Sequence, residues 1–196
     1  MQWIQCCLLL LMVCVQTPER QRAKELNDKA IEIYYTNLTD KSRLQKALQL
    51  LDEAIKLDSL YDVAYWNKVT LLCNAGEGEV ALKVLDQLLV IAPDFIGTLS
   101  MQGHILERMG RPAEAQAKYR HELDQCEKAI KKGLDSLKVP LRISRAFLLM
   151  FVKGVAVGVR EFEKIAAQYP EDKYVIMQRE TFEGFDRKKF IEDFCN

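Results

Sequence analysis

The side chains best suited to chemistry are few and widely spaced in this chain. Its 196 residues include only two histidines, His104 and His121. His121 lies five residues before Cys126, a spacing that does not place the two side chains on one face of a helix. The sequence contains no HExxH motif, no pair of CxxC motifs and no phosphate-binding glycine loop. We therefore predict that the chain is not an enzyme and has no catalytic residues, metal site or cofactor.

The composition narrows the class of partner. Lysine plus arginine and aspartate plus glutamate each number 28, so the formal net charge is zero. A surface that binds nucleic acid normally appears as an excess of basic residues, and we therefore predict no nucleic-acid partner. Hydrophobic residues make up 49% and charged residues 29%, which suits a helical protein with a core. Cys73 and Cys126 are widely spaced and are expected to be small buried hydrophobic residues.

The N-terminus has the pattern of a targeting segment. Residues 6–15 form an uninterrupted apolar run, shorter than the roughly 20 residues of a transmembrane helix but matching the apolar region of a secretory signal. Residues 11–14 resemble a bacterial lipobox, in which Cys14 is lipidated and becomes the new N-terminus. We expect residues 1–16 to be a signal peptide or lipid-anchor segment. This predicts a bacterial cell-envelope protein, lipid-anchored or periplasmic. The alternative is a buried first helix in a cytoplasmic protein.

A regular repeat of small residues and turn-forming residues organises the middle of the chain. The interval from Gly76 to Gly110 equals the interval from Ala81 to Ala115. Small residues let paired helices approach closely, and glycine permits the turns between them. Apolar residues at helical spacing lie between these points, and Pro93 ends one such stretch. A fixed period of about 34 residues is typical of stacked helical hairpins.

These features resemble the tetratricopeptide repeat (TPR) family. The match rests on the small residues, on Leu85 and Tyr119 at a shared packing position, and on the terminal proline. The resemblance implies an all-α fold over residues 17–196, a TPR-like α-solenoid of three to four helical hairpins with a C-terminal capping helix. The predicted repeats span approximately residues 20–61, 62–95, 96–129 and 139–172. In the first repeat, helices are expected over residues 20–36 and 43–57.

Residues 173–196 are expected to form the cap, with a final helix that begins after Asp186. Phe190, Ile191 and Phe194 of this helix are expected to pack inward. The alternative is a helix that docks on a partner.

The resemblance also implies which residues contact a partner, because the first helix of each TPR hairpin lines the concave face. The predicted partner-binding residues are Tyr34, Tyr35, Trp66, Asn67, Thr70, Asn74, Ser100, Met101, His104, Arg108, Phe147 and Phe151. This mixed aromatic and polar surface suits a peptide or a helix of a partner protein. For each aromatic residue the alternative is packing between helices. One TPR subgroup binds a C-terminal carboxylate, but Asn27 and Ile31 replace two of its expected residues, so we predict no binding to chaperone tails.

We therefore predict a non-catalytic protein–protein interaction module that binds a partner segment in its concave groove and is anchored in the envelope. One alternative is a structural subunit that self-assembles. Another is an accessory component of an envelope enzyme or transport complex.

Overall fold

The computed structural model describes residues 17–37, 40–93, 95–133 and 138–194, and all regular secondary structure in these residues is helical. The predicted all-α class is thus confirmed. The described helices are α2 (Pro18–Thr36), α3 (Lys41–Leu57), α4 (Asp62–Asn74), α5 (Gly78–Ile91), α6 (Thr98–Arg108), α7 (Pro112–Lys131), α8 (Lys138–Val152), α9 (Val155–Gln168), α10 (Lys173–Glu183) and α11 (Arg187–Asp193). The predicted signal segment, with Cys14, lies outside the described residues.

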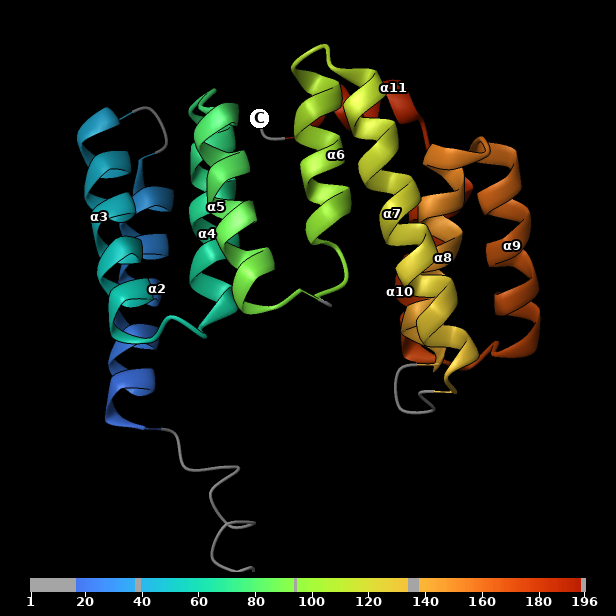
Figure 1. Ribbon diagram of the computed structural model, residues 1–196, viewed down its shortest axis with the longest axis horizontal. Helices are drawn as coiled ribbons and strands as arrows, with labels where there is room; N and C mark the ends of the chain where they lie inside the picture. Colours follow the sequence, from blue (N-terminus) through green and yellow to red (C-terminus); the bar gives the residue numbers. More distant parts are fainter. Residues whose placement is uncertain (1–16, 38–39, 94, 134–137, 195–196) are drawn as a thin grey trace, which may run out of the picture. The chain divides into compact units, whose positions relative to one another are not determined.

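The described residues divide into two compact units, one that ends at Leu71 and one that begins at Leu72, so the boundary falls within α4. In the first unit α2 and α3 pack side by side as a hairpin (Figure 1). Apolar side chains of α2, α3 and α4 form its core, in which Ala47, Leu51 and Ala54 are fully buried. These three residues carry the apolar stripe of α3 at helical spacing, which is why that face turns inward.

The second unit contains two further hairpins, α6 with α7 and α8 with α9, and α7 also packs on α8 (Figure 1). Helix α10 contacts α8 and α9, whereas α11 contacts α6. Helix α7 continues to Lys131, beyond the end of the predicted repeat at residue 129. Gly133 follows its end with φ 69°, a left-handed conformation that glycine adopts readily.

The repeat seen in the sequence is also a repeat of local backbone structure. Gly76 and Gly110 end α4 and α6 with φ values of 78° and 76°. In each case the amide after the glycine donates to a carbonyl five residues earlier, at 2.9 and 2.8 Å, as in a Schellman cap. The next helices begin at Gly78 and Pro112, so their first residues keep the same interval as the two glycines.

Two other glycines allow helices to cross closely. A Cβ atom on Gly103 would lie 2.3 Å from a ring carbon of Tyr119, so no side chain fits between α6 and α7 at this point. A Cβ atom on Gly158 would lie 2.2 Å from Cγ of Met150 on α8. The spacing within both hairpins therefore depends on glycine at the crossing point.

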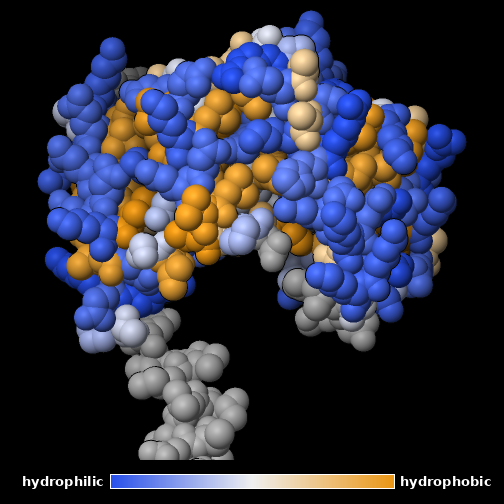
Figure 2. Space-filling model, viewed as in Figure 1, coloured by the Kyte–Doolittle hydropathy of each residue, from blue (hydrophilic) through white to orange (hydrophobic). Residues whose placement is uncertain are grey.

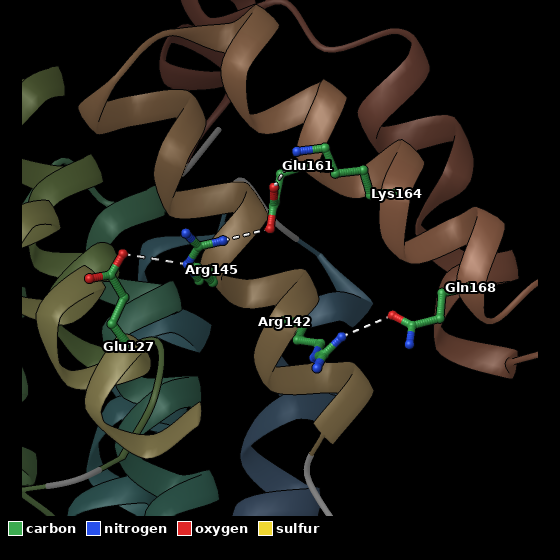
Figure 3. Close-up of polar contacts among 6 residues, drawn as sticks. All are labelled: Glu127, Arg142, Arg145, Glu161, Lys164 and Gln168. Carbon is green, nitrogen blue, oxygen red and sulfur yellow. Dashed lines mark hydrogen bonds and ion pairs between the residues drawn. The ribbon is translucent and has the colours of Figure 1, made fainter. Parts of the chain in front are cut away.

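Polar side chains link the helices of the second unit across their outer edges. Arg145 of α8 lies between two carboxylates, with Nε 3.5 Å from Glu127 of α7 and Nη1 2.6 Å from Glu161 of α9 (Figure 3). Arg142 donates to Gln168 of α9 at 3.0 Å. These side chains are partly exposed, so each ion pair contributes at most about 1 kcal/mol. Hydrophilic side chains cover most of the face seen in Figure 2, with hydrophobic ones visible between them.

Among the helices that the structure describes, none has both the length and the apolar composition needed to cross a membrane.

Candidate functional site

Helices α6 and α8 bring three predicted partner-binding residues into one aromatic cluster. The ring centroid of His104, on α6, lies 4.8 Å from that of Phe151 and 6.2 Å from that of Phe147. Phe147 and Phe151 are one turn apart on α8, and their centroids are separated by 5.2 Å. We call the surface formed by His104, Arg108, Phe147 and Phe151 the α6–α8 face.

The α6–α8 face is covered by the C-terminal part of the same chain. The ring centroids of Phe190 and Phe194 lie 5.0 and 5.1 Å from that of His104. Phe185, in the turn before α11, lies 5.7 Å from Phe151. Edge-to-face and tilted ring contacts at these separations are favourable beyond the burial of area alone. The inward packing expected for Phe190 and Phe194 is therefore observed, and its target is this face.

A chain of polar contacts runs beneath the rings. His104 Nδ1 lies 2.9 Å from the hydroxyl of Tyr119, which donates to Glu107 at 3.0 Å. The other oxygen of Glu107 accepts from Arg187 of α11 at 2.8 Å. Because the single proton of Tyr119 is given to Glu107, the network assigns the Nδ1 hydrogen to His104 as donor. One contiguous network therefore joins α6, α7 and α11.

The network is not poised for proton transfer near neutral pH. Burial, together with the positive charge of Arg187, lowers the pKa of His104 to about 3. Burial and the nearby Glu107 carboxylate raise the pKa of Tyr119 well above its usual value. General acids and bases work best when their pKa lies near the working pH. These groups instead form a neutral pair that fixes the position of α6 against α7.

Two arginines, one at each end of α11, join this helix to α6 and α8. Arg187, its first residue, donates to the carbonyl of Phe151 at 3.2 Å, and its guanidinium lies 5.0 Å from the ring centroid of that residue. Arg108 of α6 donates to the carbonyl of Glu192 at 3.2 Å and to that of Phe194. The last carbonyls of a helix have no partner within the helix, and a cation there also meets the negative end of the helix dipole.

Glu122 of α7 is a buried carboxylate close to this face, with 2% of its surface exposed. It accepts hydrogen bonds from the backbone amides of Gly97 and Ser100 at the start of α6. Burial raises the pKa of the Glu122 carboxyl, and these amide bonds oppose the shift. A pocket of about 340 Å³ adjoins it, with Phe147 and Phe182 among its lining residues.

In the first unit the predicted residues differ in exposure. Tyr34 is buried in the core, whereas its neighbour Tyr35 is 59% exposed. Trp66 and Asn67 are half-buried on α4. The side-chain amide of Asn67 donates to that of Asn27 at 2.7 Å, so these two residues pair with each other across α2 and α4.

The other predicted residues are half-buried: Thr70, Asn74, Ser100 and Met101. The hydroxyl of Thr70 donates to the carbonyl of Trp66 and that of Ser100 to the carbonyl of Gly97, both at 3.0 Å. Tyr34, His104 and Phe151 were predicted to contact a partner, and the alternative for aromatic residues was packing between helices. These three rings are buried among apolar side chains of the same chain, so they pack between helices.

Four residues that shape this region were not predicted from the sequence: Glu107, Glu122, Phe185 and Arg187. One signal could have revealed Phe185. Phenylalanine stands at positions 182, 185, 190 and 194, an aromatic density that a solvated terminal helix does not need.

Within the described residues, no group of three or more histidine, cysteine, aspartate or glutamate side chains could hold a metal ion. Cys73 and Cys126 are buried, as predicted, and burial raises the pKa of the Cys126 thiol to about 12. A thiol with that pKa is not a reactive nucleophile at neutral pH. In comparisons with known proteins, the chain matches no family model and no curated protein sequence.

Proposed function

We propose that this chain is a non-catalytic protein-interaction module of TPR-like architecture that binds a peptide or helix of a partner protein. The observation that carries the proposal is the position of α11. This short helix and the residue after it bring Phe190 and Phe194 onto the α6–α8 face, where aromatic rings and Arg108 contact them. The helix's own Arg187 pairs with Glu107 of α6. Binding a helix by its apolar side is the interaction that such a module requires.

The local repeats support the TPR-like arrangement. Helices α4 and α6 end in the same glycine cap, and the helices that follow, α5 and α7, begin at equivalent positions after it. Ala81 and Ala115 are almost completely buried, as expected for small residues at helix crossings. These features favour repeated hairpins over an irregular bundle.

The exposed Tyr35 of α2 and three half-buried residues of α4 form the proposed contact surface in the first unit. Tyr35, Trp66, Asn67 and Thr70 combine aromatic area with side chains that can form hydrogen bonds. To test this, a photo-reactive amino acid would replace Trp66 in the full chain, and cross-linked proteins would be identified in cells. A matched control would carry it at Val90, which is 82% exposed on α5.

A single partner that is captured only from position 66, and lost when Tyr35→Ala is added, would support the proposal. Identical captures from positions 66 and 90 would overturn it, and so would no capture at either.

A second candidate function is self-assembly as a structural subunit. Helix α10 exposes three large apolar side chains, with Tyr174, Ile176 and Met177 at 39%, 57% and 64% exposure. Neighbouring exposed apolar residues often mark an association surface. Sedimentation of the full chain would support this function if it showed a dimer or larger assembly that Ile176→Glu dissociates. The third candidate is an accessory subunit of an envelope enzyme or transport complex.

We further propose an envelope location, through a signal or a lipid on Cys14, on the evidence of the apolar run over residues 6–15. Intact-protein mass spectrometry of the expressed full-length chain tests this. A mass that lacks residues 1–13 and includes a lipid group would support the anchor. An unprocessed chain that retains Met1 would overturn it and favour the cytoplasmic alternative.

A further inference from the structure

Helix α11 lies on the α6–α8 face in the way that a bound ligand lies on its site. None of its residues is fully buried, yet Phe190 and Phe194 point their rings at His104. Phe190 also lies 5.7 Å from Phe147 and 5.8 Å from Phe151. The helix therefore presents one aromatic edge to the face and leaves its other side exposed.

The polar contacts also favour one direction of the helix on the face. Arg187 pairs with Glu107 at the N-terminal end of α11, and Arg108 binds the carbonyls at its C-terminal end. Helices α6 and α8 thus contribute three groups to the contact: the carboxylate of Glu107, the guanidinium of Arg108, and the aromatic cluster, which contacts the helix between these two. A helix placed in the opposite direction would bring its positive N-terminal end to Arg108, which is unfavourable.

Helix α11 is too short to be stable on its own. It has seven residues, and isolated helices shorter than about 12 residues are marginal in water. Its one side-chain cap is Asp186, which accepts from the amide of Lys189 at 3.0 Å. The ion pair between Arg187 and Glu107 is partly open to solvent, with side-chain exposures of 34% and 19%. Release of α11 is therefore a local event of low cost relative to unfolding of the hairpins.

We infer that the α6–α8 face is a helix-binding site whose resident occupant, α11, exchanges with a partner helix of the same chemistry. That partner helix carries phenylalanines at positions i and i+4, a basic residue three positions before the first, and accessible carbonyls at its C-terminal end. This inference rests on the proposed function and specifies the kind of partner.

The tether sets how strongly a partner must bind. A segment joined to its site by a short linker has an effective concentration on the order of millimolar. A partner helix in solution competes with that concentration. Its apparent Kd therefore equals its intrinsic Kd divided by the fraction of molecules in which α11 is released. Weakening α11 alone should therefore strengthen binding of an added helix at the same face.

The test measures binding of a fluorescein-labelled peptide of residues 185–194 with an amidated C-terminus, by fluorescence anisotropy. The proteins are the full-length chain and its Phe190→Ala/Phe194→Ala variant, in which the face is unchanged but its occupant is weakened. We expect the variant to bind the peptide at least about tenfold more tightly than the unmodified chain. A matched control, Ile176→Ala/Met177→Ala, truncates two exposed apolar side chains of α10 and should bind as the unmodified chain does.

A peptide in which Phe190 and Phe194 are alanine should not bind the variant. Equal affinity of the variant and the unmodified chain would overturn the inference, as would absence of binding to either. These outcomes are separate from the cross-linking test at Trp66, which probes the other unit.

Hydrogen exchange on the unmodified chain provides a measurement that does not depend on the variant's folding. Saturating peptide should speed exchange of the amides of the chain's own α11 while those of α8 keep their protection. Unchanged exchange in α11 at saturation would overturn the inference.

Discussion

The α6–α8 face and the α2–α4 side of the first unit take corresponding places in the predicted repeats, but they differ in what covers them. On the α6–α8 face, His104 and Phe151 are 5% and 2% exposed beneath the rings of the C-terminal segment. In the first unit Tyr35 is 59% exposed and Asn67 is half-buried, paired with the buried Asn27. The place of a residue in a repeat therefore does not fix its exposure. Adjacent rings favour a covering element, whereas the paired amides of Asn27 and Asn67 satisfy each other without one.

Truncating one aromatic side chain in each region would sharpen this comparison most. Phe151→Ala should lower the free energy of unfolding by about 4 kcal/mol, because it removes a buried ring and leaves a cavity. Tyr35→Ala should change it by less than about 0.5 kcal/mol, because that ring is mostly exposed. Urea denaturation followed by circular dichroism measures both. Similar losses for the two variants would contradict the assignment of the two regions.

One part of the pH dependence of stability should arise from His104 on the α6–α8 face. The pKa of His104 is about 3 in the folded protein, below its ordinary value near 6.5. As the pH falls through 6.5, the unfolded chain takes up a proton that the folded protein does not. Stability therefore decreases as the pH falls from 6.5 to 3, and the full contribution of His104 is present above pH 6.5. From pH 7 to pH 5 this loss should be about 2 kcal/mol.

The variant His104→Gln removes this titration and keeps a donor for Tyr119. Because the carboxylates titrate equally in both proteins, the difference in their pH dependence isolates the imidazole. A parallel decline in stability for the two proteins would show that His104 is protonated in the folded state.

A smaller effect than those of Phe151 and His104 concerns the amide pair of the first unit. Asn67→Ala should cost about 1 kcal/mol, because Asn27 is 3% exposed and loses a hydrogen-bond partner. In a double-mutant cycle with Asn27→Ala, the loss in the double variant should be smaller than the sum of the single losses. Strict additivity would mean that the pair contributes nothing and that its amides are available to a partner.

The local parts of the fold could be predicted from the sequence. The expected helices over residues 20–36 and 43–57 correspond to Pro18–Thr36 and Lys41–Leu57. The turns at Gly76 and Gly110, and the final helix capped by Asp186, were also predicted. Each depends on residues within one or two turns of the backbone, which periodicity and capping rules describe well.

The covering of the α6–α8 face could not be predicted in the same way. The bond from Arg108 to Glu192 joins residues 84 positions apart, and hydrophobic periodicity identifies an apolar face without identifying what covers it. The role of Glu122 was missed for a related reason, since a carboxylate in the middle of a helix normally indicates a solvated position.

The contact of Glu122 with the start of α6 bears on the order in which the second unit folds. Helix α6 begins after Gly97 and has no side-chain cap of its own, so its first amides depend on a carboxylate that the following helix supplies. Before α7 is in place, those amides have only water as a partner, and the first turn of α6 frays. Full order in the first turn of α6 therefore requires contact with α7.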